Sequence, residues 1–470
     1  MFDYDDKNRK GKLICEEDIL TYIRNHFSVK NKGADFANRS YKAKLSNRKL
    51  PSRIYAIQES GNFNFGIHGE ILNFLRDEQI IDISSTESFD KRLKCGFTSE
   101  IVSDTLTYEL RDYQAECIQT CVQSGYGTVV SATGSGKSLM QAYLLENWKL
   151  INGSLNALII VPGVGLVNQL CSDFEEYGVT FSYSPWTGKH EKQDTEVIIV
   201  NTELLCSRFY DHKDLLTVDI LLRDECHGNK AQNEMTKIIQ KVKTPNKFGF
   251  TGTLPKENID RWKILGAFGP IIFEKSSKEL IDEKFLTNVE VKVLKLNHTR
   301  PMRFPYKREV AYLEQSEARN NFISTIAKKL SKNVLILVNH IEHAEMLFDT
   351  FRGALKQVFY ITGEMPVEER ERIIELMENN DDIVCIAISK IFSTGINVKN
   401  LHYVMFTFGG KSFVRTIQSI GRGLRLHESK DKLIIFDFYD NSRYSTEHFE
   451  ERKIFYDDEQ IPWKQTEIVL

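Results

Sequence analysis

The chain lacks the features that mark a membrane, secreted or zinc-binding protein. Its eight cysteines include no Cys-x-x-Cys pair, and its histidines form no cluster at zinc-ligand spacing. The longest apolar run, 157–167, contains a proline and two glycines and is too short to cross a bilayer. The N-terminus is charged and has no apolar signal core. We therefore expect a cytoplasmic protein with reduced thiols and no membrane role.

A large net charge is also missing. The 62 Lys and Arg residues nearly balance 65 Asp and Glu, so the total charge of −3 does not indicate a nucleic-acid partner. Local composition differs, because residues 21–60 carry nine Lys or Arg against two Asp or Glu, interleaved with five aromatic residues. This pattern suits contact with phosphates and bases. A solvated charged face over a small core would give the same pattern.

A Gly-x-Gly-Lys-Ser segment lies between a short β-prone run and a stretch whose composition is typical of a helix. Small residues let backbone N–H groups surround phosphates, and the next helix directs its positive end at them. Lys137 then supplies charge for the β- and γ-phosphates, and the Ser138 hydroxyl reaches Mg²⁺. A glycine turn that caps a helix explains the glycines but not the Lys-Ser pair, although the strict motif has glycine where this chain has Ser131. The predicted nucleotide-binding residues are Thr133, Gly134, Ser135, Gly136, Lys137 and Ser138.

An acidic pair follows a second buried run. Residues 218–222 lead into Asp224-Glu225-Cys226-His227, in the same predicted domain as the phosphate loop. In such a domain Asp224 can hold Mg²⁺ through its water shell, and Glu225 can polarise the water that attacks the γ-phosphate. Adjacent carboxylates are common on surfaces, but their position directly after a strand favours the catalytic interpretation. The pattern therefore predicts a site for ATP and Mg²⁺.

Apolar runs alternate with amphipathic segments from about residue 107 onward, in two successive series. Such runs are typical of parallel strands that are buried on both faces. The two series predict two tandem doubly wound α/β domains. A basic, proline-containing stretch within residues 288–317 is expected to join them. The expected strands are 127–130, 155–161, 197–200, 218–222 and 247–250, then 334–338, 358–361, 383–388, 403–408 and 433–438.

The second series contains two arginines that suit the neutralisation of charge on a transferring phosphate. Arg422 and Arg425 lie three residues apart, so on a helix both side chains point the same way. Arginines aimed across an interdomain cleft act as arginine fingers, which are worth about 10³–10⁵ in rate. Surface salt bridges explain most arginine pairs on helices. The accompanying phosphate loop and acidic pair favour the finger role here.

Taken in order, these motifs resemble those of superfamily 2 helicases over roughly residues 110–437. The acidic box reads Asp-Glu-Cys-His, and residues 392–402 look like the corresponding segment of the UvsW-type phage recombination helicases. The resemblance implies two RecA-like domains with doubly wound parallel sheets and a small α+β N-terminal domain. The segments that carry it are Gln114, Ala132–Ser138, Asp224–His227, Thr251–Thr253, Ser393–Gly395 and Gln418–Arg425.

The resemblance also implies roles and boundaries. Gln114 would read the adenine edge, and Gly395 would contact the bound nucleotide. Four further residues would contact DNA or couple it to the nucleotide: Thr202, Thr251, Thr253 and Gln418. The implied domains are a basic DNA-binding accessory domain (1–105), a first helicase domain (106–290), a second with the arginine fingers (291–450) and a C-terminal tail (451–470).

The implied function is an ATP-dependent DNA helicase or translocase that unwinds or branch-migrates forks, Holliday junctions, D-loops or R-loops in recombination, repair or replication. Its cofactors would be ATP and Mg²⁺, and its partners branched, duplex and single-stranded DNA and phage recombination or replication proteins. We expect a monomer in the host cytoplasm. Two alternatives stay open: an RNA helicase or remodeller with the same ATP site, because backbone contacts distinguish the sugars weakly, and a nucleotide-gated DNA clamp without strand separation.

Overall fold

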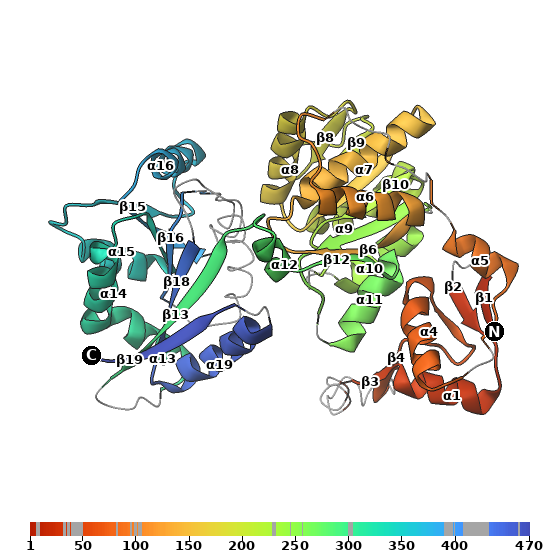
Figure 1. Ribbon diagram of the computed structural model, residues 1–470, viewed down its shortest axis with the longest axis horizontal. Coiled ribbons are helices and arrows are strands. Elements are labelled where there is room, and N and C mark those ends of the chain that lie inside the picture. Colours follow the sequence, from red (N-terminus) through yellow and green to blue (C-terminus); the bar gives the residue numbers. More distant parts are fainter. Residues whose placement is uncertain are drawn as a thin grey trace. The chain divides into compact units, whose positions relative to one another are not determined.

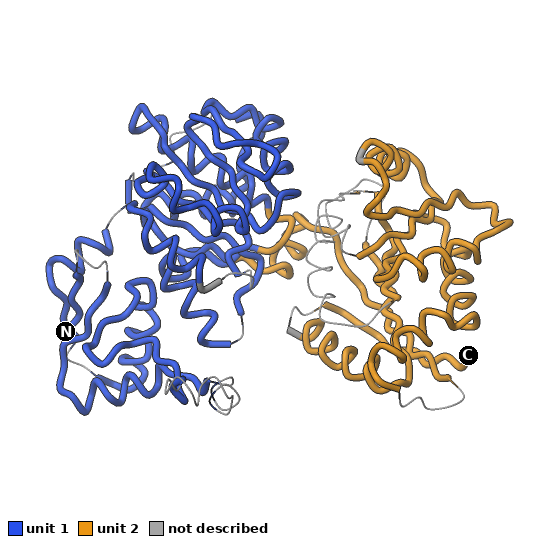
Figure 2. The backbone as a smooth tube through the Cα atoms, turned by 180° about the vertical axis from the view of Figure 1, so that it is seen from behind, with its two compact units in different colours: residues 1–131, 136–274 blue, residues 132–135, 275–470 orange. Residues whose placement is uncertain are grey.

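The protein contains two seven-stranded sheets, each with its own helices, and Figure 1 shows their elements. The chain divides into two compact units, residues 1–131 with 136–274 and residues 132–135 with 275–470 (Figure 2). The predicted α/β class with two doubly wound domains is confirmed. The computed structural model describes residues 1–5, 10–31, 34, 38, 50–80, 83–94, 96–97, 101, 106–227, 232–244, 246–255, 257–298, 304–389, 398, 400–407, 432–458 and 461–470.

The sheet of the first unit has the strand order β12-β6-β11-β10-β7-β9-β8. All pairings from β6 across to β8 are parallel. The central strands are buried along their whole length, which is why their sequences are continuous apolar runs rather than alternating ones. The strands are β6 (Tyr126–Ser131), β7 (Ala157–Val161), β8 (Tyr183–Trp186), β9 (Val197–Asn201), β10 (Ile220–Arg223), β11 (Asn246–Thr251) and β12 (Ile271–Lys275).

Helices connect these strands, as crossovers between parallel strands require. The most buried of them, α7, is capped at its carboxyl end by Gly153, whose φ of 72° lies in the left-handed region that glycine adopts at helix ends. Sequence reasoning missed β8 and β12 because both are edge strands, and β8 contains a proline that reads as a loop. The helices are α6 (Asp112–Ser124), α7 (Lys137–Asn152), α8 (Val164–Tyr177), α9 (Thr202–Arg208), α10 (Gln232–Lys241) and α11 (Asn258–Phe268).

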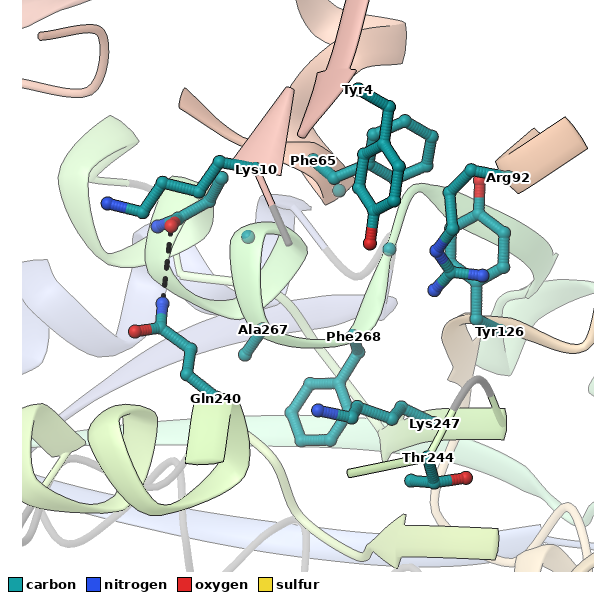
Figure 3. Close-up of a pocket in the computed structure, with 14 residues that line it drawn as sticks. Tyr4, Lys10, Phe65, Arg92, Tyr126, Gln240, Thr244, Lys247, Ala267 and Phe268 are labelled. Carbon is teal, nitrogen blue, oxygen red and sulfur yellow. Dashed lines mark hydrogen bonds between the residues drawn. The ribbon is translucent and has the colours of Figure 1, made fainter. Parts of the chain in front are cut away.

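The N-terminal part of the first unit is a small α+β module that shares its core with the α/β layer. Phe27 of the module packs with Trp262 of α11, and Phe65 with Tyr126 of β6. Figure 3 shows where the two parts face each other around a cavity. The elements are β1 (Phe2–Asp5), β2 (Lys10–Leu13) and β5 (Asn62–Asn64) in one antiparallel sheet, β3 (Ser28–Lys30) with β4 (Arg53–Tyr55), and the helices α1 (Glu17–His26), η1 (Phe65–Ile67), α4 (His68–Asp77) and α5 (Glu87–Leu93).

The sheet of the second unit has the order β15-β16-β14-β17-β18-β13-β19, and every pairing is parallel. Its strands are β13 (Asn288–Asn297), β14 (Val334–Val338), β15 (Gln357–Ile361), β16 (Ile383–Ile388), β17 (Tyr403–Phe406), β18 (Lys432–Asp440) and β19 (Trp463–Val469). Its helices are α12 (Ser277–Asp282), α13 (Tyr306–Gln315), α14 (Glu317–Lys329), α15 (Ile341–Asp349), α16 (Val367–Asn379) and α19 (Arg443–Asp458).

Two of these strands were not expected. The segment read as a join between domains contains β13, and the segment read as a C-terminal tail contains β19, which pairs with it. Polar residues on the half-buried face of β13, and the largely exposed β19, interrupt the apolar run that would mark a buried strand. Across the described ranges, no helix combines the length and apolarity that crossing a membrane would need.

Candidate functional site

Three of the predicted motifs meet at one edge of the first sheet. Strand β6 leads into the loop 132–136, β10 into Asp224, and β11 ends at Thr251. Strand β11 lies between β6 and β10, and all three run parallel. Their carboxyl ends therefore lie side by side, in the place where open α/β sheets bind their ligands.

The loop before α7 has the backbone that a phosphate cradle needs. Gly134 and Gly136 have φ values of 84° and 81°, in the left-handed region that favours glycine. Gly136 is also the N-cap of α7, so the first backbone N–H groups of that helix lie next to the loop. A Cβ atom added at Gly136 would lie 2.4 Å from Nε2 of Gln114, so the Gln114 side chain borders the loop.

The first two residues of α7, Lys137 and Ser138, place polar groups at the loop. Lys137 is only 9% exposed, and its Nζ donates to the carbonyl of Ser131 at 3.1 Å. The hydroxyl of Ser138 lies 2.9 Å from that of Tyr177, the last residue of α8. Tyr177 was not predicted from the sequence, since nothing in the motif points to a residue on another helix. Both groups are thus held at the loop by protein partners. A phosphate oxygen can replace the partner of the ammonium, and a metal ion can replace the partner of the hydroxyl.

The oxygen donors at this edge fit a magnesium ion that is bound mainly through its nucleotide. Mg²⁺ prefers oxygen ligands and keeps several waters, so one or two protein groups suffice when phosphates supply the rest. The hydroxyl of Ser138 and the carboxylate of Asp224 are groups of this kind. The portion of the chain that the structure describes holds no cluster of three or more His, Cys, Asp or Glu side chains suited to a metal ion.

The acidic box connects directly to the end of β11. Glu225 Oε2 lies 3.3 Å from His227 Nδ1, which lies 2.6 Å from Thr251 Oγ1. Thr251 Oγ1 donates to the carbonyl of Thr253 at 2.7 Å. Because the one hydroxyl hydrogen of Thr251 is used there, we assign the hydrogen to Nδ1 of His227, which donates to Thr251. A continuous polar chain thus runs from Glu225 to the backbone at Thr253.

The backbone of the acidic box is strained at one residue and is anchored to the sheet at its neighbours. Glu225 has a φ of 46°, an uncommon conformation for a residue with a side chain and one that persists at sites where neighbours impose it. The backbone N–H of Asp224 donates to the carbonyl of Ile160 in β7 at 2.9 Å. Burial raises the pKa of the Cys226 thiol to about 12, so this residue is an uncharged part of the core.

The other predicted residues divide into two groups. Thr202 starts α9 after β9, and its hydroxyl donates to the carbonyl of Val161 at 3.1 Å, so the structure places it two strands beyond β10. Thr251 and Thr253 lie with the acidic box, as described above. Four predicted residues lie outside the described ranges: Gly395, Gln418, Arg422 and Arg425.

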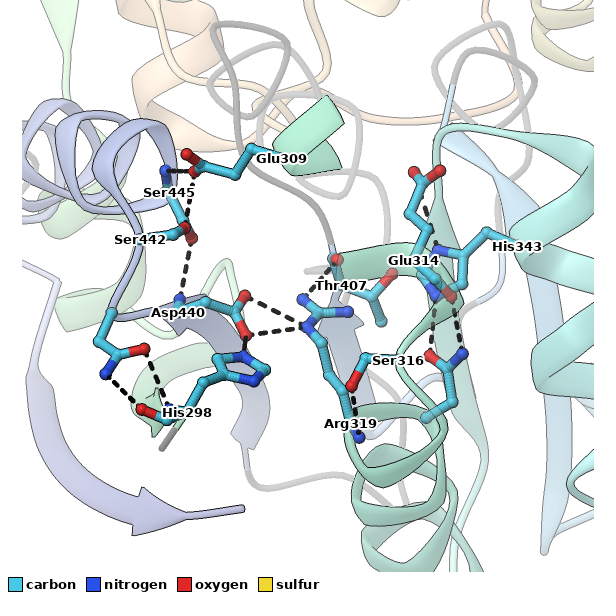
Figure 4. Close-up of polar contacts among 12 residues, drawn as sticks. His298, Glu309, Glu314, Ser316, Arg319, His343, Thr407, Asp440, Ser442 and Ser445 are labelled. Atoms are coloured by element: carbon cyan, nitrogen blue, oxygen red, sulfur yellow. Dashed lines mark hydrogen bonds and ion pairs between the residues drawn. The ribbon is translucent and has the colours of Figure 1, made fainter. Parts of the chain in front are cut away.

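A buried polar network lies at the carboxyl edge of the second sheet (Figure 4). Arg319 of α14 donates to Asp440 of β18 at 3.1 Å and to the carbonyl of Thr407, just after β17, at 2.8 Å. His298 Nε2 lies 2.8 Å from the same carboxylate. Burial by itself raises the pKa of Asp440, but Arg319 and His298 together hold it below its usual range. The network fixes Thr407, the last described residue before the segment that contains the predicted arginines.

Comparisons with known proteins identify the family. A model described as "Type III restriction enzyme, res subunit" matches residues 107–256, and one described as "Helicase conserved C-terminal domain" matches residues 317–427. The ATP-dependent DNA helicase uvsW of Enterobacteria phage T4 is 27% identical over 457 residues, which cover 92% of this chain and 89% of that protein. The chain is an ATP-driven, UvsW-like helicase of superfamily 2.

A viral protein is similar to this helicase over most of its length, and a solved structure shares its fold. Putative helicase 22 of Sulfolobus islandicus filamentous virus is 25% identical over 463 residues, which cover 91% of this chain and 78% of the viral protein. The solved structure of the ATP-dependent Type ISP restriction-modification enzyme LlaBIII bound to DNA matches with a TM-score of 0.59 and 14% identity. That match covers 77% of this helicase and 31% of the larger chain, and it shows a shared fold.

Proposed function

We propose that this helicase is an ATP-dependent DNA helicase or translocase that unwinds or branch-migrates forks, Holliday junctions, D-loops or R-loops. Similarity to a phage DNA helicase over most of both chains supports DNA as its substrate. The observation that carries the motor function is the polar chain from Glu225 through His227 to Thr251, at the same sheet edge as the phosphate loop. This chain of contacts links Glu225, which would act on the water that attacks ATP, to the Thr251–Thr253 segment at the end of β11.

In this proposal the loop binds the triphosphate and Lys137 contacts its β- and γ-phosphates. Ser138 and Asp224 would hold Mg²⁺, which would supply positive charge to neutralise the charge that develops on the phosphate oxygens. Glu225 orients the attacking water and accepts its proton. Gln114, which borders the loop, contacts the adenine edge. Gly395 would contact the nucleotide, and Arg422 and Arg425 would stabilise the transition state.

The structural change caused by ATP hydrolysis would be transmitted toward the DNA through His227. Loss of the γ-phosphate changes the surroundings of Glu225, and the hydrogen bond from His227 to Thr251 passes that change to the Thr251–Thr253 segment. Thr202 and Gln418 would contact DNA or respond to it. The accessory domain, residues 1–105, would hold duplex or branched DNA; part of its basic segment, 39–49, lies outside the described ranges. We further propose a monomer acting in a host cytoplasm with phage recombination or replication proteins.

The decisive experiment replaces Lys137 by Ala and titrates ATP hydrolysis with single strands, duplexes, forks and four-way junctions. We expect hydrolysis to fall by about 10²-fold or more, as when a charge-stabilising group is removed from an active site. Lys149→Ala is the matched control, because Lys149 lies near the other end of the same helix, where its ammonium binds Glu196. A Lys137→Ala enzyme with full activity would remove the assignment of the loop.

The same assay separates the alternatives. Greater stimulation by matched RNA than by DNA would favour an RNA remodeller, and hydrolysis without strand displacement would favour a clamp. Arg422→Ala and Arg425→Ala should leave ATP binding nearly intact while hydrolysis falls. Equal loss of binding and hydrolysis in both variants would argue against arginine fingers.

A further inference from the structure

A cavity, drawn in Figure 3, lies at the amino ends of two central strands of the first sheet, whereas the phosphate loop lies at the carboxyl end. It opens beside Tyr126 and Lys247, near the amino ends of β6 and β11, whereas the loop follows the carboxyl end of β6. The ends of β6 are separated by about 17 Å, given the rise of a strand. The cavity has a volume of about 340 Å³, in the range of small-molecule sites. It is therefore distinct from the ATP site.

Two parts of the unit build this cavity and are fixed to each other. The N-terminal module supplies one wall, and the α/β layer supplies the other. A Cβ atom at Gly66 would lie 1.8 Å from the carbonyl oxygen of Leu265, so the module approaches α11 as closely as glycine allows. Arg261 also donates to Glu70 across this junction at 2.8 Å. The cavity is thus preformed rather than a gap between mobile parts.

Its charge is positive. Lys10 and Arg92 come from the module and Lys247 from β11, while the fourteen lining residues that the structure describes include no carboxylate. The Arg92 guanidinium lies 4.2 Å from the ring centroid of Tyr126, which holds it over that ring. Lys247 is 9% exposed and donates to the carbonyl of Ile239 at 2.6 Å. An anion placed in this space is attracted by these cations, because no carboxylate among the described lining residues offsets their charge.

The remaining walls suit a planar polar group beside that anion. In Figure 3 the Tyr4 hydroxyl points into the cavity and the Phe268 ring lies on the opposite side. Gln240 donates to Asn64 Oδ1 at 3.2 Å, and each of these amides keeps a further donor or acceptor that can match a base edge. Phosphate, ring faces and amide edges together are the chemistry of a nucleotide.

We propose that this cavity binds a nucleoside monophosphate group, supplied either by a free nucleotide or by the 5′-phosphorylated end of a DNA strand. Arg92, Lys10 and Lys247 contact its phosphate, and the aromatic side chains contact its base. The proposal goes beyond the motor function and does not require it, because none of these residues belongs to the ATP site.

The test is calorimetric titration of the full chain without added ATP or ADP, because either nucleotide would compete for the proposed cavity. The probes are dTMP, a thymidine trinucleotide with a 5′-phosphate, and the same trinucleotide without it. We expect binding of at least one phosphorylated probe. Binding of both assigns the site to free nucleotides as well as strand ends, and binding of the phosphorylated trinucleotide alone assigns it to strand ends. Failure of both, or equal binding of the unphosphorylated probe, overturns the proposal.

Variants decide whether that binding occurs in this cavity. Arg92→Gln and Lys10→Gln should each weaken it about tenfold or more, as expected for the loss of one charge-assisted hydrogen bond. Lys12→Gln is the matched control, since Lys12 lies on the same strand, is exposed and does not line the cavity. Thermal melting verifies that each variant folds, and Lys10→Gln carries the test if Arg92→Gln does not. Unchanged binding in Lys10→Gln, or an equal loss in Lys12→Gln, overturns the assignment.

Lys137→Ala separates this proposal from the motor function. That variant should lose ATP hydrolysis and still bind the phosphorylated probe with unchanged affinity. Loss of probe binding in Lys137→Ala would place the probe at the phosphate loop and overturn the second site, whatever the outcome for hydrolysis.

Discussion

The Nδ1 atom of His227 lies 2.6 Å from Oγ1 of Thr251, and this hydrogen bond joins two segments that are 24 residues apart in the chain. It forms because β10 and β11 are neighbouring parallel strands whose carboxyl ends lie side by side. Glu225, whose Oε2 lies 3.3 Å from the same Nδ1 atom, is the residue that we assign to the attacking water. His227 is therefore placed to report the state of the nucleotide to Thr251.

Replacing His227 by Ala should uncouple hydrolysis from strand displacement. ATP binding should be retained, because His227 is not part of the phosphate loop, while strand displacement should fall more than ATP hydrolysis. Rates of both processes in His227→Ala, Thr251→Val and the double variant give a double-mutant cycle, in which contacting residues differ from additivity by about 0.5–3 kcal/mol. Additive effects would show that the hydrogen bond carries no coupling.

Replacing Gly136 by Ala should weaken ATP binding by about tenfold or more, because the φ of 81° is strained for alanine and the new Cβ would displace Gln114. Gly153→Ala is the control, at the other end of α7. It has a φ of 72° but no described atom within 4 Å of the added Cβ, so it carries the backbone strain alone. Titration with a fluorescent ATP analogue compares the two variants, and equal affinities would contradict this account of the loop.

Replacing Asp440 by Asn should destabilise the second unit by about 3–5 kcal/mol, because Arg319 would remain buried without its anionic partner. The control is Asp349→Asn, which breaks an exposed pair with Arg352 and should cost about 0–1 kcal/mol. Urea unfolding followed by circular dichroism measures both changes. Similar losses in the two variants would show that the network in Figure 4 contributes no more than a surface pair.

Acidification should destabilise the second unit through His343. Burial lowers the pKa of this imidazole to about 3, whereas an unfolded chain binds the proton near the ordinary value of 6.5. The unfolded state therefore holds more protons between these values, and stability falls as the pH falls from 6.5 toward 3. The expected loss between pH 7 and pH 5 is about 2 kcal/mol. Urea unfolding of His343→Gln at both pH values should show a smaller difference, and an equal difference would contradict the role of His343.

Edge strands show where sequence reasoning stopped. In each sheet five of the seven strands were predicted, because interior strands appear as continuous apolar runs and the edge strand β15 is itself apolar over residues 358–361. Strands β8, β12 and β19 lie at sheet edges and β13 lies next to one, so part of their surface is polar and resembles loop sequence. The spacing of apolar residues cannot distinguish an edge strand from a loop unless the neighbouring strand is known.

The sequence by itself determined the fold class, the phosphate loop and the acidic box, because each depends on residues that are adjacent in the chain and on their local backbone needs. Only the tertiary structure decided that His227 bonds to Thr251, that Tyr177 meets Ser138, and that a positively charged cavity forms against the N-terminal module. These contacts depend on strand order and on helix packing, which bring together residues whose separation in the chain carries no local signal.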